Sequence, residues 1–289
     1  MYLCAYFDYY TTMQINPSEL VEHIKGNPHI YVSGNFAIMK SLNSAIGTRI
    51  MDMVQTPQYV MLGRTVLISA GTATFEINLI GYELKQGDVL VIPQHNYISI
   101  PVVSDDFDGV IISFENSSVE IEKCIHLSPA IEDFERLQAY TDLLWITTQR
   151  PHSIKSLSHL QTALLYDIQQ MESQRLKSNP IVRSRSAELF QRFLDAHQSE
   201  NLPRSIKSYA EYLCVSPNHL SAVVQKESGR SVMSWLNAHC ILRAKVMLIH
   251  TDKPMYIIAE ELGFQRATFF SRFFHRETGV TPSVFRKKQ

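Results

Sequence analysis

The chain has 289 residues, of which 45% are hydrophobic and 19% are charged, and its formal net charge is −1 at pH 7. This length suits two domains at about 150 residues each, and no apolar run approaches the roughly 18 residues that a membrane span requires. The four cysteines are far apart and form no CxxC motif, so we expect neither a disulfide framework nor a zinc site, but a reducing cytoplasm.

The charge is divided unevenly along the chain. Residues 1–179 hold 11 Lys and Arg against 19 Asp and Glu, a net charge of −8, whereas residues 180–289 hold 16 against 9, a net charge of +7. A basic half suits a polyanionic partner such as nucleic acid. Two solvated surfaces that differ by chance would give the same pattern.

The N-terminal stretch MYLCAYFDYY is rich in aromatic residues. It lacks the basic start and the small-residue cleavage site of a secretory signal, so we expect none. The stretch could be an arm that folds over the next domain, or a first strand or helix that is permanently packed.

Residues from about 28 to 127 predict β structure. Short runs of β-forming residues, such as TATFEINLIG and DVLVIP, alternate with Gly, Asn, Asp or Pro. This pattern is typical of an antiparallel barrel or sandwich. The mouth of a barrel is a usual place for a ligand, and three candidate side chains, each with an ordinary structural alternative, are Arg49, His95 and Tyr97.

Two helices are predicted next. Ser128 and Pro129 suit an N-cap and a first helical position, so one helix should run from there to about residue 148, and a second from about 154 to 177. Apolar residues in the second helix recur at spacings of 3 and 4, as between paired helices. This seam could pair with another helix or pack against the β domain of its own chain: Leu157, Leu160, Leu164, Ile168 and Met171.

A linker is expected at residues 178–180, Ser-Asn-Pro. We therefore predict a β-barrel domain at 1–128, a helical connector and candidate dimerisation region at 129–179, and an all-α domain at 180–289. The predicted fold class is α+β multidomain: an N-terminal antiparallel β-barrel with following helices, then an all-α domain with two helix-turn-helix motifs.

Those two motifs follow from an internal repeat. LSAVVQKESGRSVMSW, from Leu220, aligns with FSRFFHRETGVTPSVF, from Phe270, and AEYL at 210–213 aligns with AEEL at 259–262 after a one-residue slip in the turn. Each copy predicts a short helix, a tight turn, a second helix and a Gly stop. This is the layout of a helix-turn-helix.

The second helix of the second copy should have two faces. Phe270, Phe273 and Phe274 are spaced to share one buried face. Arg266 and Arg272 then lie largely toward solvent, where Arg can pair with guanine in a major groove. Phe269 could pack partly, or touch a thymine methyl or a sugar.

A helix at 231–250 should connect the two copies. Twenty residues span about 30 Å, and successive major grooves on one face of DNA lie about 34 Å apart. The connecting helix could therefore hold two recognition helices in adjacent grooves. The alternative is an all-helical module for a ligand or a protein partner.

Residues 205–288 resemble the DNA-binding domain of the AraC/XylS family of bacterial transcription regulators. The resemblance is most specific in IIAEELGFQRATFFSRFFHRETGVTPSVFRK, whose G-x-T-P and aromatic-Arg ending matches the family signature. It implies a double helix-turn-helix that binds DNA. The chain departs from the family at Cys240, where an Arg is frequent, and in NHLSAVVQ, a first recognition helix that is poor in charge.

The acidic half is similar to the cupin-type sensor barrel that often precedes this domain, through LKQGDVLVIPQH at 84–95. Metal-dependent cupins need an HxH pair, a Glu and a later His, yet no His lies between His29 and His95. We therefore expect a binding barrel without metal or cofactor. No Gly-rich phosphate loop or nucleophile motif is present, so no enzyme activity is expected.

These observations predict a cytoplasmic, sequence-specific DNA-binding transcription regulator that a small molecule in the N-terminal barrel controls. The alternatives are control by a protein partner, or a cupin enzyme fused to a DNA-binding domain. Expected partners are double-stranded DNA, a small-molecule effector, a second copy in a homodimer and RNA polymerase, without a membrane. The residues expected to contact DNA are Ser216, Asn218, His219, Ser221, Ala222, Gln225, Gln265, Arg266, Thr268, Phe269, Ser271, Arg272, His275, Arg286 and Lys287.

Overall fold

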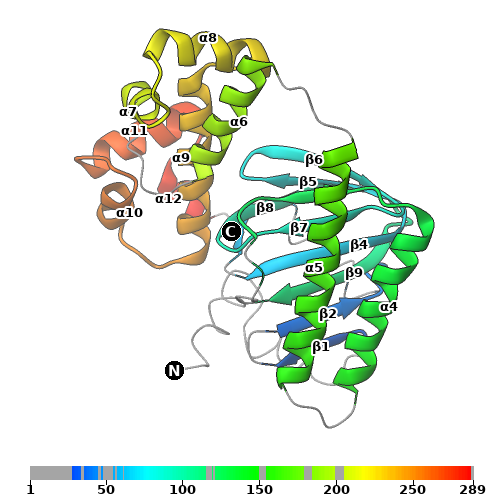
Figure 1. Cartoon of the computed structure of the whole chain (residues 1–289). Helices are drawn as coiled ribbons and strands as arrows, with labels where there is room; N and C mark the ends of the chain where they lie inside the picture. The colour runs from blue at the N-terminus through cyan, green and yellow to red at the C-terminus, as the bar shows by residue number, and fades with distance from the viewer. Residues whose placement is uncertain are drawn as a thin grey trace. The chain divides into compact units, whose positions relative to one another are not determined.

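A computed structural model describes residues 28–33, 36–44, 47, 55, 57–60, 62–114, 119, 121–149, 154–178, 184–198 and 205–287. The chain divides into two compact units, Met1–Pro180 and Ile181–Gln289. In the described residues, the first unit combines antiparallel sheets with two helices, and the second is helical (Figure 1). The aromatic N-terminal stretch and Arg49 lie outside the described residues.

The strands of the first unit form two antiparallel sheets. One has the order β1-β2-β9-β4-β7-β10 and the other the order β3-β8-β5-β6. The strands are Ile30–Ser33 (β1), Phe36–Lys40 (β2), Gln58–Val60 (β3), Gly63–Ala70 (β4), Thr72–Ile77 (β5), Ile80–Lys85 (β6), Val89–Ile92 (β7), Asn96–Val103 (β8), Asp108–Phe114 (β9) and Ile125–Leu127 (β10). Among the described strands the two sheets stay separate, so the predicted closed barrel is not observed, and the sandwich is the closer description.

Alternation along the strands gives each side of the larger sheet its own core. In β4, Val66 and Ile68 pack with Phe75 and Ile98 of the smaller sheet. Leu67 points to the opposite side, where it joins a cluster with residues from two helices. Successive side chains of a strand point to opposite faces, so one strand serves both layers.

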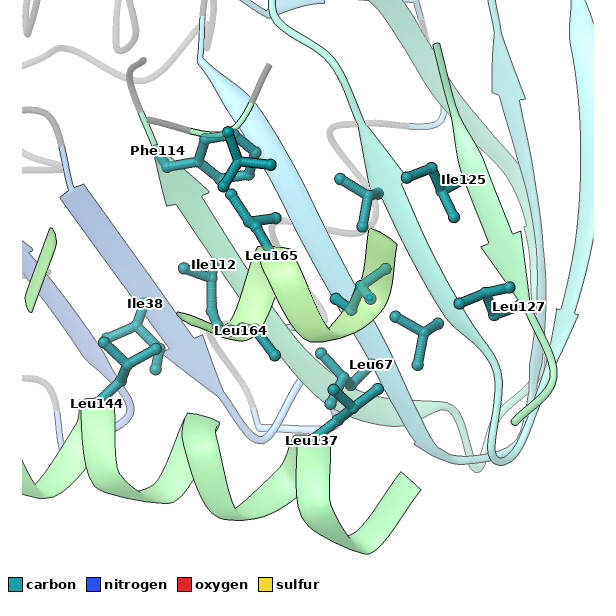
Figure 2. Packing of buried hydrophobic residues seen from close by; sticks show 14 of the residues in the cluster. Ile38, Leu67, Ile112, Phe114, Ile125, Leu127, Leu137, Leu144, Leu164 and Leu165 are labelled. Atoms are coloured by element: carbon teal, nitrogen blue, oxygen red, sulfur yellow. The ribbon is translucent and has the colours of Figure 1, made fainter. Parts of the chain in front are cut away.

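Two helices cover the outer side of the larger sheet, α4 (Ile131–Thr148) and α5 (Ile154–Ser178). Figure 2 shows Leu137, Leu144, Leu164 and Leu165 of these helices directed at strand residues such as Ile112. Each buried Leu contributes roughly 1.5–3 kcal/mol of burial free energy. The helices therefore form a third layer of the first unit.

The predicted seam of α5 packs on the sheet of its own chain. Leu157, Leu164 and Ile168 are buried in this cluster, and Leu160 and Met171 pack against it. The alternative that the seam packs against its own β domain is thus confirmed. The predicted start of α4 is wrong by two or three residues, because Ala130 is the N-cap and its carbonyl accepts the N–H of Phe134 at 2.9 Å.

The second unit contains seven helices within its described part. They are α6 (Arg185–Gln198), α7 (Ile206–Tyr212), α8 (Pro217–Ser228), α9 (Val232–His250), α10 (Met255–Glu261), α11 (Ala267–Thr278) and α12 (Pro282–Lys287). Serine side chains cap α7, α8 and α9, and Gly229 and Gly279 end α8 and α11 at φ of 68° and 76°. The positive φ suits glycine, which carries no Cβ.

The long helix α9 is the centre of this unit. Residues Ile241, Ala244 and Leu248 pack with the rings of Phe270 and Phe274 from α11. An 18-residue window of α9, Val232–Ile249, is long and apolar enough to cross a membrane by composition alone, but 44% of it is buried inside the unit. Its apolar side chains are thus explained by the core that they form.

Candidate nucleic-acid interface

The turn of the first helix-turn-helix is fixed by backbone hydrogen bonds. After α7, the N–H groups of Leu213 and Val215 donate to the carbonyls of Tyr209 and Ala210, both at 2.9 Å. Between them Cys214 adopts φ of 57°, a left-handed conformation that is uncommon outside glycine. The chain therefore reverses within a few residues and begins α8.

The second copy of the repeat has the same turn. The N–H groups of Leu262 and Phe264 donate to the carbonyls of Ile258 and Ala259, at 3.1 and 2.8 Å. Gly263, at φ of 77°, occupies the place that Cys214 has in the first turn. These hydrogen bonds lie 49 residues apart in the two copies, and the helices that follow lie 50 apart, which is the one-residue slip expected from the alignment.

The predicted contact residues of α8 are mostly exposed. Ser216 is the N-cap, and its side chain accepts the N–H of His219 at 3.2 Å. Ser221 is half-buried and donates to the carbonyl of Pro217, whereas the amide of Gln225 donates to the carbonyl of Gly229 at 2.9 Å. The exposed members of this set are Ser216, Asn218, His219, Ala222 and Gln225.

The predicted face of α11 is exposed and basic. Phe270, Phe273 and Phe274 are buried as expected, and Ser271 is half-buried. Arg266 and Arg272 are exposed and form no ion pair with another described residue. The exposed residues of the predicted set are Gln265, Arg266, Thr268, Phe269, Arg272 and His275.

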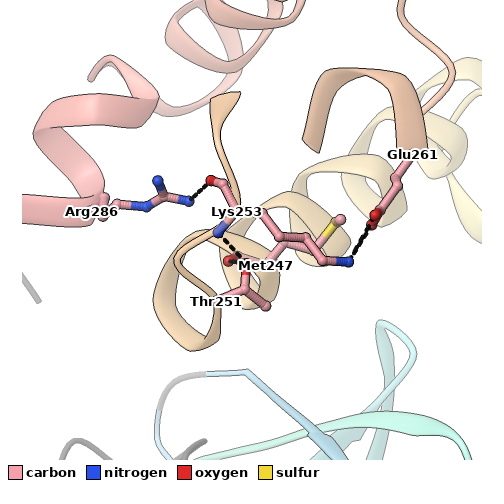
Figure 3. Close-up of polar contacts among 5 residues, drawn as sticks. All are labelled: Met247, Thr251, Lys253, Glu261 and Arg286. Carbon is pink, nitrogen blue, oxygen red and sulfur yellow. Dashed lines mark hydrogen bonds and ion pairs between the residues drawn. The ribbon is translucent and has the colours of Figure 1, made fainter. Parts of the chain in front are cut away.

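Arg286 is used inside the protein. Its guanidinium donates to the carbonyl of Leu248 at 3.2 Å and so ties α12 to the end of α9. It also donates to the carbonyl of Lys253 at 2.9 Å (Figure 3). The Lys253 ammonium in turn donates to both oxygens of Glu261, at 2.7 and 2.9 Å. We therefore assign Arg286 a structural role, and its predicted contact with DNA stays a prediction. Lys287 is exposed.

The sequence reasoning did not predict the contacts of two basic residues, Arg276 and Lys253. The guanidinium of Arg276 pairs with Glu277 at 2.6 Å and lies 5.4 Å from the ring centroid of Phe273. It is exposed on the same helix as Arg272. Lys253 was missed because its partner, eight residues away, is brought close only by the bend between α9 and α10. Cys240, where the family often has Arg, is buried against α11.

The candidate ligand residues of the first unit lie at one end of β8. His95 is exposed at φ of 60°, and its Nδ1 shares a hydrogen bond of 3.1 Å with the hydroxyl of Tyr59. Tyr97 is buried, and its ring centroid lies 5.0 Å from that of Tyr59. The structure thus brings His95 and Tyr97 together through Tyr59, which the sequence reasoning missed.

Comparison with known proteins finds similarity in the C-terminal unit. A helix-turn-helix domain family matches residues 209–288. The arabinose operon regulatory protein of Escherichia coli (strain K12) is 33% identical over 119 residues, which cover 41% of this chain and 40% of that protein. The regulatory protein PocR of Salmonella typhimurium is 27% identical over 157 residues, covering 54% of this chain and 50% of that protein.

Among solved structures, the C-terminal domain of AraT from Geobacillus stearothermophilus is 30% identical, with a TM-score of 0.33 over 37% of this chain and 89% of that one. The chain thus spans half or less of the length of the two curated relatives named above. Both relatives are named as regulatory proteins. The C-terminal part of the chain is therefore similar to a helix-turn-helix domain that regulatory proteins contain.

Proposed function

We propose that this chain is a sequence-specific DNA-binding transcription regulator of the cytoplasm. The single observation that supports this most is the pair of turns with matching hydrogen bonds, each followed by a helix with an exposed face. Both helix-turn-helix motifs pack on α9, in the half of the chain with a net charge of +7. Exposed cations attract the phosphate backbone of DNA.

The two recognition helices would enter adjacent major grooves. The 19 residues of α9 span about 28 Å, which is comparable with the groove repeat of about 34 Å. We assign base or phosphate contacts in one groove to Arg266, Thr268 and Arg272. The polar face of α8, with Asn218 and His219, would contact the other groove and supply little charge. Lys287 would add a phosphate contact.

The first unit would act as a cupin-like sensor of a small molecule. Two facing sheets with an apolar interior support this proposal, and the cluster of Tyr59, His95 and Tyr97 is the candidate contact region. Helices 129–179 would connect the units and form a homodimer. Exposed apolar side chains on α4, including Leu143 and Ile146 at 47% and 53% exposure, support that role. RNA polymerase would be a further partner.

Site selection from random duplex DNA with the purified full chain tests the DNA-binding proposal. We expect a pair of half-sites about one helical turn apart, bound with an affinity that falls as salt rises. The Arg272→Ala variant should bind more weakly. If Arg272 contacts a phosphate, the salt slope, which is the slope of log K against log salt concentration, should be smaller by about 0.9. If Arg272 pairs with a base edge, the preference for that base should be lost instead. Recovery of no preferred sequence would contradict the proposal.

A thermal-shift screen tests the sensor. A true effector raises the melting temperature of the first unit with concentration, in proportion to the logarithm of ligand over dissociation constant. If no small molecule does so while a protein from the same cell does, control by a protein partner replaces the small-molecule proposal.

A further inference from the structure

We propose that Phe269 reads the 5-methyl group of a thymine, which makes it a specificity-determining residue of the second helix-turn-helix. The inference rests on the proposed DNA-binding function and names the chemical feature that this position recognises. Three observations support it: the exposure of the ring, its place in α11, and the residue at the same place in the first copy.

The exposure of Phe269 separates it from the other rings of α11. Phe270 and Phe274 are fully buried, and Phe273 is 7% exposed, whereas Phe269 is 47% exposed. It is therefore not part of the apolar stripe that holds α11 on α9. About half of the surface of this residue is left in water, where a ligand can cover it.

Phe269 lies at a position of α11 from which helix-turn-helix proteins contact base edges. Arg266 is the N-cap of α11, so Phe269 is the third helical residue, and Arg272 lies one turn further along. Residues three apart on a helix are neighbours on its surface. In helix-turn-helix proteins, the N-terminal residues of the recognition helix contact base edges. Phe269 thus forms an apolar spot on an otherwise polar and basic face.

The first copy shows that the fold does not require an apolar residue here. The repeat aligns Phe270 with Leu220, both of which are fully buried, and therefore aligns Phe269 with His219. His219 is exposed in the same helical position. Because a polar side chain serves equally well in α8, the phenyl ring of Phe269 is explained by what it binds and not by packing.

Thymine is the base that fits. In the major groove it alone presents a methyl group, and apolar contact with Phe is an established chemical match for that group. Deoxyuridine keeps the base pair and the O4 acceptor but lacks the methyl. Removing one buried methyl-sized group should weaken binding about fourfold.

The test replaces each thymine of a selected site by deoxyuridine in turn and measures dissociation constants by fluorescence anisotropy at fixed salt. For the wild-type chain we expect about fourfold weaker binding at one thymine beneath α11. For Phe269→Ala we expect weaker binding to the thymine site and equal affinity for thymine and deoxyuridine there. Phe269→His introduces the residue that the first copy of the repeat has at this position, and it should also show equal affinity for thymine and deoxyuridine. This second variant keeps the test valid if the Ala variant misfolds.

Tyr256→Ala is the matched control, because Tyr256 is an aromatic residue of α10 with 62% exposure and is not among the proposed contacts. It should keep the fourfold ratio. If Phe269→Ala and Phe269→His also keep the ratio, or if the wild type distinguishes no thymine from deoxyuridine, this inference is overturned while DNA binding stands. If the wild type binds no duplex in a salt-dependent way, the proposed function fails, and this inference fails with it.

Discussion

Replacing Arg286 by Met separates two roles that a basic residue near a DNA-binding face can have. The change removes the guanidinium donors but keeps an apolar stem of similar length. In the wild type these donors bind the carbonyls of Leu248 and Lys253. A hydrogen bond from a charged donor contributes about 1.5–3 kcal/mol when it is buried. One bond is part-buried and the other exposed, so we expect the pair to contribute about 2 kcal/mol in total.

The assay is urea unfolding in a Trp145→Phe background, so that Trp235 reports on the C-terminal unit. Arg286→Met should lower the free energy of unfolding by about 2 kcal/mol and leave the salt slope of DNA binding unchanged. Lys287→Ala is the control, for which we expect the opposite pair of results. Its free energy of unfolding should lie within about 0.5 kcal/mol of the wild-type value, and the salt slope of its DNA binding should be smaller by about 0.9. An Arg286→Met variant of normal stability whose salt slope is smaller by about one would refute the structural role.

Three further changes test other parts of the structure. Cys214→Gly should stabilise the second unit by about 0.5–1 kcal/mol, because relief of the left-handed conformation outweighs the added freedom of the unfolded chain; a lower melting temperature would contradict this. Burial raises the pKa of Cys124 to about 11, so at pH 8 only about one Cys124 thiol in a thousand is ionised. Iodoacetamide should therefore label the exposed Cys214 before Cys124, and Cys124 should react only as the pH approaches 11. Peptide mass spectrometry measures the labelling of each cysteine. Leu164→Ala should cost about 2–5 kcal/mol of stability, whereas Tyr166→Ala, an exposed position on the same helix, should cost about 0.5 kcal/mol; equal losses in thermal unfolding would argue against α5 as a core helix.

The helix-turn-helix pair could be predicted because its signals are local. Gly263 and Gly279 mark a turn and a helix end, Ser216 marks a helix start, and the Phe spacing gives the buried face of α11. Each signal depends on residues within one or two turns. The structure agrees with them to within one or two residues.

The sheet arrangement could not be predicted, because it depends on residues far apart in the chain. Strand β2 pairs with β9, so that Phe36 lies opposite Phe114, and β4 lies between β9 and β7. Alternating hydrophobicity indicates that a strand has two faces but not which strand lies next to it. The same limit explains the two separate sheets in place of one barrel.

Arg286 shows the same limit for a side chain. Its place after a recognition helix and beside Lys287 suggested a phosphate contact. Its carbonyl partners, Leu248 and Lys253, are 38 and 33 residues away. Only the packing of α12 against the end of α9 decides where the guanidinium points.

Both helix-turn-helix motifs pack on the single continuous helix α9. The number of residues in α9 therefore sets the distance and the rotation between the two motifs. Deleting one residue from the middle of α9 would shorten the helix by about 1.5 Å and rotate everything beyond it by about 100°. Each helix-turn-helix motif could still fold in such a protein, yet α8 and α11 would no longer face the same side of a duplex. Under the proposed DNA-binding function, substitutions at exposed residues of α8 and α11 would change the preferred bases, while the length of α9 would keep the distance between the two half-sites constant.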